Sequence, residues 1–145
     1  PPRMVLNAPS SIQDQSHVSP DGRWITYNSD ESGTWEVYAA SFPDLTGKRQ
    51  ISIDGGMQPL WRRDGQELFY LSPQGQLMAV DVHVSESTSI ETGAPRALFR
   101  TGLNPSVQVG EYGVAPDGKR FLFMEPVGDR NPPISLLLNW QAKPR

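Results

Sequence analysis

Apolar and polar residues alternate over short stretches along the whole chain, and each stretch ends at a cluster of Gly, Pro, Asp or Ser. Alternation with a period of two is typical of strands that bury one face, whereas helices repeat about every 3.6 residues. No long stretch has the helical period, so we predict an all-β chain with almost no helix. The clearest alternation surrounds three Asp-Gly pairs, which begin at Asp21, Asp64 and Asp117.

The three Asp-Gly pairs lie in segments that align with one another: SHVSPDGRWITY, PLWRRDGQELFY and YGVAPDGKRFLF. Three aligned positions are apolar or aromatic in every segment: Val18, Trp61 and Val114; Ile25, Leu68 and Phe121; Tyr27, Tyr70 and Phe123. Residues two apart on a strand share a face. Asp followed by Gly suits a tight turn, because Gly readily takes a positive φ. The alignment therefore predicts a strand, a tight turn and a second strand, with one repeated inward face.

Further strands complete each predicted unit. Third strands fit at 37–42, 77–82 and 135–140, fourth strands fit at 49–53 and 96–100, and residues 84–94 form a polar link. The turns are 43 and then 53 residues apart, and a four-stranded propeller blade is about 40 to 50 residues long. We therefore predict one domain, residues 1–145, that is a β-propeller fragment of about three four-stranded antiparallel blades. The predicted blades are residues 14–53, 56–101 and 107–142.

The number of blades is itself informative. Propellers have about four to eight blades, so three blades leave two apolar faces uncovered. Either further blades of a larger propeller cover these faces, or two copies associate into a six-bladed ring. The third unit lacks a fourth strand, and Arg3 to Leu6 resembles the segment that begins at Arg96. Residues 3–6 are therefore a candidate closing strand, for this chain's own third blade or for a partner's.

The string SPDGRW, with its relatives RRDGQE and APDGKR, resembles the WD40-like repeats of TolB-type bacterial propellers. The resemblance covers nearly the whole chain. The chain is similar to the C-terminal propellers of larger bacterial proteins, some of which carry a kinase domain upstream. Such propellers serve as protein-binding platforms, sensor domains or non-catalytic halves of peptidases. The resemblance also implies an extracytoplasmic location. The chain has neither a kinase motif nor a nucleophile elbow, so no enzyme activity is expected from it.

Composition narrows the functional classes. The formal net charge is -3 without a run of one sign, which argues against nucleic-acid binding because that needs clustered Lys and Arg. The chain has no cysteine, so disulfides and Cys-ligated zinc are excluded. No apolar run is long enough for a membrane span. Two histidines in different blades do not make a zinc site. We predict no catalytic residues, no bound metal and no cofactor.

Five residues are candidates for contact with a ligand or partner: His17, Trp24, Trp35, Arg62 and Arg63. His17 lies on the innermost predicted strand, where side chains can face the propeller axis. Trp24 aligns with Glu67 and Arg120, which predicts an exposed indole, and Trp35 lies in a hairpin beside a glycine. Arg62 and Arg63 belong to a set of basic residues at the aligned turns: Arg23, Arg62, Arg63, Lys119 and Arg120.

Other candidate groups have structural interpretations. The three turn aspartates form turns rather than a calcium site, since each turn offers one carboxylate. Asp30, Glu31, Glu36 and Asp54 are expected in solvated loops. Trp61 and Trp140 align with apolar residues and are predicted to pack in the core.

Together these features predict a non-catalytic propeller module that binds a protein or a small ligand. Two alternatives stay open: an accessory propeller of a hydrolase or peptidase, and a propeller enzyme with a metal at its centre. The expected partners are the remaining blades or a second copy, and a protein.

Overall fold

The computed structural model describes residues 11–84, 89–105, 112–124 and 134–137. All regular elements in these ranges are strands, as the period-two pattern predicts. Since no helix occurs there, none of the described elements could cross a membrane as a helix.

The first sheet has four antiparallel strands in the order in which they occur along the chain. They are β1 (Gln13–Val18), β2 (Trp24–Ser29), β3 (Glu36–Ser41) and β4 (Arg49–Gln50). β4 is shorter than the predicted strand 49–53. The chain turns away just after it, at Asp54 and Gly55, which both have a positive φ.

The second sheet contains five strands: β5 (Met57–Trp61), β6 (Glu67–Leu71), β7 (Gln76–Val84), β8 (Ile90–Thr92) and β9 (Arg96–Arg100). β7 pairs with β9 along its first half and with β8 along its second half. The polar link predicted at residues 84–94 contains a strand, β8. Ile90 is buried with Val82 in the core, so the few apolar residues of this segment suffice to attach a strand.

The third sheet consists of β10 (Tyr112–Val114), β11 (Phe121–Met124) and β12 (Ile134–Leu137). β12 covers the first part of the predicted strand 135–140. The remainder of that strand, with Trp140, and the candidate closing strand 3–6 lie outside the described residues.

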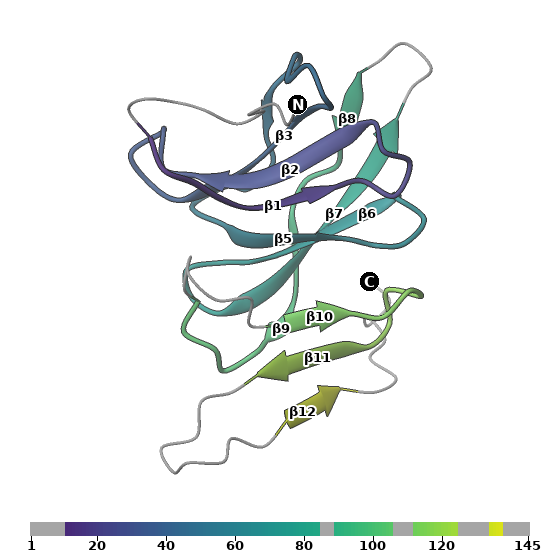
Figure 1. Cartoon of the computed structure of the whole chain (residues 1–145). Coiled ribbons are helices and arrows are strands. Elements are labelled where there is room, and N and C mark those ends of the chain that lie inside the picture. The colour runs from purple at the N-terminus through teal and green to yellow at the C-terminus, as the bar shows by residue number, and fades with distance from the viewer. Residues whose placement is uncertain (1–10, 85–88, 106–111, 125–133, 138–145) are drawn as a thin grey trace, which may run out of the picture.

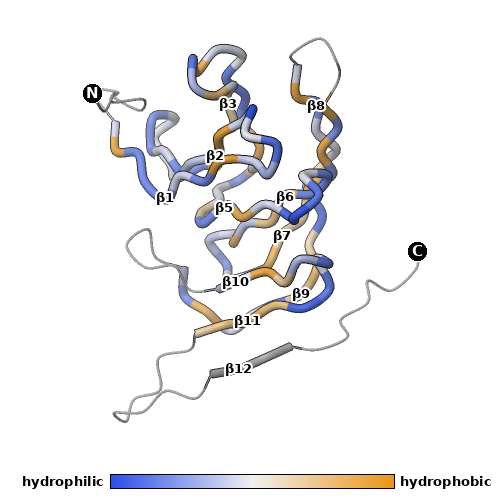
Figure 2. The backbone as a smooth tube through the Cα atoms, turned by 45° about the vertical axis from the view of Figure 1, so that its right-hand side comes forward, coloured by the Kyte–Doolittle hydropathy of each residue, from blue (hydrophilic) through white to orange (hydrophobic). Residues whose placement is uncertain are grey.

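The three sheets stack face to face in chain order, with the second sheet between the other two (Figure 1). Alternate residues of β6 point to opposite neighbours. Leu68 and Tyr70 pack toward the first sheet with Trp24, while Phe69 and Leu71 pack toward the third with Phe121. Figure 2 shows the hydrophobic segments gathered along these middle strands. Two of the buried apolar clusters therefore lie in seams between blades, as propeller packing requires. A third cluster belongs to the first sheet alone and consists of Ile25, Tyr27, Tyr38 and Ala40.

One predicted inward position differs between the blades. Trp61 is half-buried and packs against the first seam, as predicted, but Val18 is 45% exposed. Val18 lies on β1 of the first sheet, and no described sheet packs on the side away from the second sheet. The aligned position is therefore covered only where a neighbouring blade reaches it.

Candidate functional site: a hollow between the first two turns

The three Asp-Gly turns have the same hydrogen bonds. In each turn the Gly amide donates to the residue three positions earlier, over 2.9 Å: Gly22 to Ser19, Gly65 to Arg62, and Gly118 to Ala115. The aspartate Oδ1 accepts the amide of the residue two positions later, at 3.0 to 3.1 Å. The glycines all have φ near +70°, which a side chain would strain. The turn interpretation of these aspartates is thus supported by their geometry.

The turns lie in a row along one edge of the stack, on the right of Figure 1. A Cβ on Gly65 would lie 3.8 Å from Pro20, which belongs to the preceding turn. A Cβ on Gly118 would lie 2.6 Å from Cδ of Arg62. Each turn therefore touches the next, and the edge is a continuous rim rather than three separate loops.

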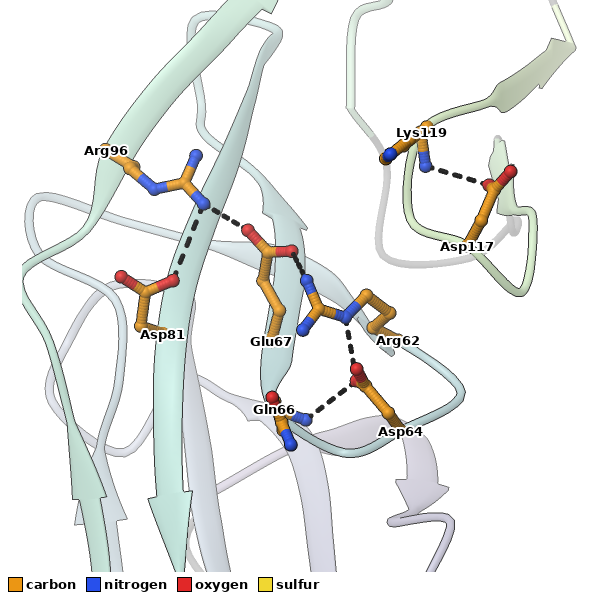
Figure 3. Close-up of polar contacts among 8 residues, drawn as sticks. All are labelled: Arg62, Asp64, Gln66, Glu67, Asp81, Arg96, Asp117 and Lys119. Carbon is orange, nitrogen blue, oxygen red and sulfur yellow. Dashed lines mark hydrogen bonds and ion pairs between the residues drawn. The ribbon is translucent and has the colours of Figure 1, made fainter. Parts of the chain in front are cut away.

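The basic residues of this rim are largely paired with carboxylates (Figure 3). Arg23 bonds Asp21 at 2.8 Å, and Arg62 bonds Asp64 at 2.7 Å and Glu67 at 2.6 Å. Glu67 is 6% exposed and also bonds Arg96. Because these charges compensate one another, the rim is not the open basic surface that the sequence suggested. Arg63 is exposed and has no ion pair among the described residues.

A hollow of about 370 Å³ opens in the rim between the first two turns. Its wall comes from both turns and from the end of β7: Ser19, Asp21, Arg23, Trp24, Trp61, Asp64, Gly65, Gln66, Val82, His83 and Val84. Trp24 is 3% exposed, so the prediction of an exposed indole is wrong. β2 points this side chain into the seam toward the second sheet, where its edge forms part of the floor of the hollow together with Trp61.

The polar groups of the hollow fall into two kinds. Ser19 Oγ is fully engaged, since it donates to Asp21 at 2.5 Å and accepts the Trp24 amide at 2.9 Å. Such bonds fix the turn. Gln66 and His83 have exposed side chains with no side-chain hydrogen bond among the described residues. Gln66 and His83 are therefore the unengaged side chains of the hollow, while Asp21 and Asp64 are held by the turns but remain partly exposed.

His17 lies outside this hollow, on β1. It is surface-exposed, but the chain around it displaces water from one side and lowers the pKa of the imidazole. Its backbone carbonyl accepts the indole N–H of Trp61 at 3.3 Å. The contact that ties His17 to the second blade is thus made by its main chain.

The innermost strands are joined by a buried polar chain. Asn28 donates to Gln15 Oε1 at 3.0 Å and accepts the amide of Gln58 at 3.0 Å. The Gln58 carbonyl accepts the hydroxyl of Tyr112 at 2.8 Å. Gln15 and Gln58 both have a positive φ at bulges in β1 and β5. These bonds link all three blades, through equivalent irregularities in the first two, which indicates a structural role.

Trp35 lies at the opposite end of the same seam and lines a second hollow. The four acidic residues considered as a calcium cluster do not converge: in the described part of the chain no three His, Asp or Glu side chains meet at one point. Glu31 instead pairs with Lys48 at 2.7 Å, and Asp30 accepts the amide of Ile12 at 2.8 Å.

Sequence reasoning missed Glu67, Gln66 and His83 as members of the rim. Gln66 follows an Asp-Gly turn, which is a signal that could have found it. His83 reaches the hollow through the unforeseen length of β7, and Glu67 was aligned with a residue predicted to be exposed. The places of His83 and Glu67 in the rim could not be predicted without knowing how the strands pair.

No protein-family model matches this chain, and no curated protein matches its sequence. Solved structures do match its fold. TolB from Acinetobacter baumannii has a TM-score of 0.57 at 16% identity, over 88% of this chain and 30% of that one. An oligogalacturonate lyase in complex with manganese has a TM-score of 0.61 at 19% identity, over 92% and 37%. An oligogalacturonate lyase from Vibrio parahaemolyticus has a TM-score of 0.56 at 14% identity, over 90% and 38%.

At these identities the likeness concerns the fold alone, and this chain spans only 30 to 38% of the length of those structures. The similar proteins include TolB and a manganese-bound lyase, so one architecture accompanies different functions. The chain has the fold of part of a TolB-like β-propeller.

Proposed function

We propose that this chain is a non-catalytic binding module that takes a segment of a partner protein, or a small ligand, in the rim hollow. The observation that carries the proposal is the combination of an aromatic floor, from Trp24 and Trp61, with the unengaged polar side chains of Gln66 and His83. The wall around this floor is mainly polar, with fixed polar side chains of the kind that orient a ligand in a concave site.

The rigidity of the rim supports the same function. The aspartates beside the hollow are held by turn amides and arginines, so their oxygens are positioned before a ligand arrives. Preorganised groups lose little conformational entropy on binding. A carboxylate held in this way is better suited to recognition than to proton transfer, because its negative charge is stabilised: the pKa values of Asp21 and Asp64 are both lowered.

A selection experiment tests the proposal. Peptides are selected from a random display library on the immobilised chain, and their affinities are measured by titration calorimetry for the wild type, Gln66→Arg and Gln74→Arg. Gln74 is also an exposed turn glutamine, but it lies in the β6–β7 turn, away from the rim. We expect Gln66→Arg to weaken binding about tenfold or more, as for a central interface residue, and Gln74→Arg to leave it unchanged.

Equal affinity of both variants would refute the rim hollow as the site. Cleavage or chemical change of the bound peptide would refute the non-catalytic assignment, and it would favour the alternative of a hydrolase component. A manganese-dependent reaction would favour the metal-enzyme alternative.

A further inference from the structure

The second hollow, at the end of the seam opposite to the rim, has a distinct chemical character. It measures about 760 Å³ and is lined by Thr34, Trp35, Glu36, Gln50, Ile53, Asp54, Gly55, Met57 and Pro73. Two of these residues are acidic and none is basic. Ile53, Met57 and Pro73 supply apolar surface, and Trp35 supplies an indole. The hollow thus combines negative charge with an apolar and aromatic wall.

Glu36 is buried at 4% exposure without a basic partner among the described residues. Its carboxylate accepts the hydroxyl of Ser52 and the amide of Gly55, the latter at 2.9 Å. These two bonds hold the segment between β4 and β5, which connects the first two blades. An ionised carboxylate can accept about four hydrogen bonds. Acceptor capacity therefore remains on a buried negative group.

Asp54 adds a second carboxylate that is fully free. It is exposed, sits at a φ of 61°, and its side chain has no hydrogen bond or ion pair with the described residues. The adjoining Gly55 is packed so closely on Pro73 that a Cβ would lie 2.4 Å from that ring. Contact with the second blade therefore fixes this turn. The fixed turn holds Asp54 in place.

A buried hydroxyl lies behind these carboxylates. Tyr70 is fully buried, and its hydroxyl makes no hydrogen bond of full geometry, although the main-chain amide of Ile53 lies close to it. Burial raises the pKa of this phenol to about 12; the nearby amide of Ile53 acts in the opposite direction, and the charges of Glu36 and Asp54 raise the pKa further. A buried hydroxyl without a full hydrogen bond is unusual. The negative charges of Glu36 and Asp54 therefore act on the buried residue behind the hollow.

We propose that the second hollow binds an organic cation, namely an ammonium or guanidinium group on an apolar stem. Glu36 and Asp54 attract the charge, the Trp35 indole stacks on it as in other cation–π contacts, and Ile53, Met57 and Pro73 receive the stem. A lysine or arginine side chain of a partner protein and a free alkylamine share this chemistry. The site is separate from the rim hollow, and either one can fail without the other.

The test uses N-acetyl-lysine methylamide, N-acetyl-arginine methylamide and butylamine, with N-acetyl-norleucine methylamide as the neutral isostere. Amide shifts of ¹⁵N-labelled protein are followed during titration. We expect the cations to shift Gly55, Gly56 and the Trp35 indole, and to bind at least about fivefold more tightly than the isostere at low salt. Tighter binding of the amino-acid probes indicates a protein side chain as the natural occupant, whereas tighter binding of butylamine indicates a small amine.

Two variants and a control locate the site. Asp54→Asn keeps a residue that tolerates a positive φ but removes the charge, and we expect it to weaken cation binding about fivefold. Trp35→Leu should weaken binding similarly with the charges intact. Asp44→Asn, at another exposed loop aspartate, should change nothing. Equal binding of the neutral isostere, unchanged affinity in Asp54→Asn, or displacement of the amines by Ca²⁺ or Mn²⁺ at equal concentration would overturn the proposal.

Discussion

Glu67 is the residue on which the charge pattern of the rim depends. It lies buried between Arg62 and Arg96, and Arg96 reaches Asp81 only at 3.5 Å (Figure 3). Removing a buried charge leaves its partners uncompensated, which costs more than losing an exposed pair.

We expect Glu67→Gln to lower the free energy of unfolding by roughly 1.5 to 3 kcal/mol, the range for hydrogen bonds to charged groups. Asp81→Asn is the matched control, because the Asp81 side chain is 59% exposed, and it should cost less than about 1 kcal/mol. Urea denaturation measures both. A smaller loss in Glu67→Gln than in Asp81→Asn would contradict the buried network.

His17 gives the chain a pH dependence in the weakly acidic range. Burial lowers its pKa below the ordinary value of 6.5, so the unfolded chain binds a proton more readily than the folded one. The stability contributed by neutral His17 is therefore complete above pH 6.5 and is lost as the pH falls from there toward the folded-state pKa.

His17→Gln should flatten the dependence of stability on pH below about 6.5, the ordinary pKa of a histidine. His83→Gln is the control, since that imidazole is exposed. Thermal unfolding at a series of pH values measures the effect. An unchanged slope in His17→Gln would show that the imidazole is not desolvated in the folded state.

At the scale of the elements, the three turns have one backbone geometry but different surroundings. Gly22 and Gly118 both have a strained φ for any other residue, 74° and 67°. Nothing lies within 4 Å of a Cβ on Gly22, whereas a Cβ on Gly118 would press on the stem of Arg62. Arg62 cannot easily yield, because Asp64 and Glu67 hold its guanidinium.

Gly22→Ala should therefore cost about 1 kcal/mol, for the backbone conformation alone, and Gly118→Ala should cost clearly more. Urea denaturation of the two variants compares them directly. Equal losses would mean that the second and third turns do not touch.

The hairpins were predictable because tight turns and period-two alternation are local properties, and the same pattern occurs three times in the sequence. The exposure of individual side chains was not predictable, because it depends on how the neighbouring blade packs against them. Trp24, Glu67 and Arg120 occupy one aligned position that faces the following blade. Trp24 and Glu67 are buried there, while Arg120 is exposed because no described sheet follows the third.

The candidate site was predictable only in part for the same reason. Trp24, Trp35 and Arg62 do belong to the rim or to the two hollows, but the partners that complete these surfaces come from another blade. Glu67 and His83 are examples, since their positions depend on how β6 and β7 pair. A hollow at a seam is a property of two blades, and an alignment of single repeats does not contain it.

At the scale of the whole molecule, the outer face of the third blade is open. Leu122 and Met124 are 40% and 50% exposed, whereas the aligned Phe69 and Leu71 are buried under the third blade. Exposed apolar faces of this kind mark interfaces. The earlier expectation of further blades or a second copy remains a prediction at this face.

We expect the chain to self-associate reversibly in sedimentation velocity, and Leu122→Lys with Met124→Lys to shift it toward the mass of one chain, 16.1 kDa. Val18→Lys, at another exposed apolar position of the first blade, should change the mass distribution less. A wild-type monomer at all accessible concentrations would rule out the two-copy ring.

We propose that this partial propeller binds a partner, without chemical change, in the hollow between its first two turns. The most direct measurement is an amide and indole shift map of the ¹⁵N-labelled chain with a selected peptide, together with the mass of that peptide after prolonged incubation. We expect shifts concentrated at Gly65, Gln66, His83 and the Trp61 indole, and an unaltered peptide. Shifts confined to other surfaces, or a cleaved or modified peptide, would contradict it.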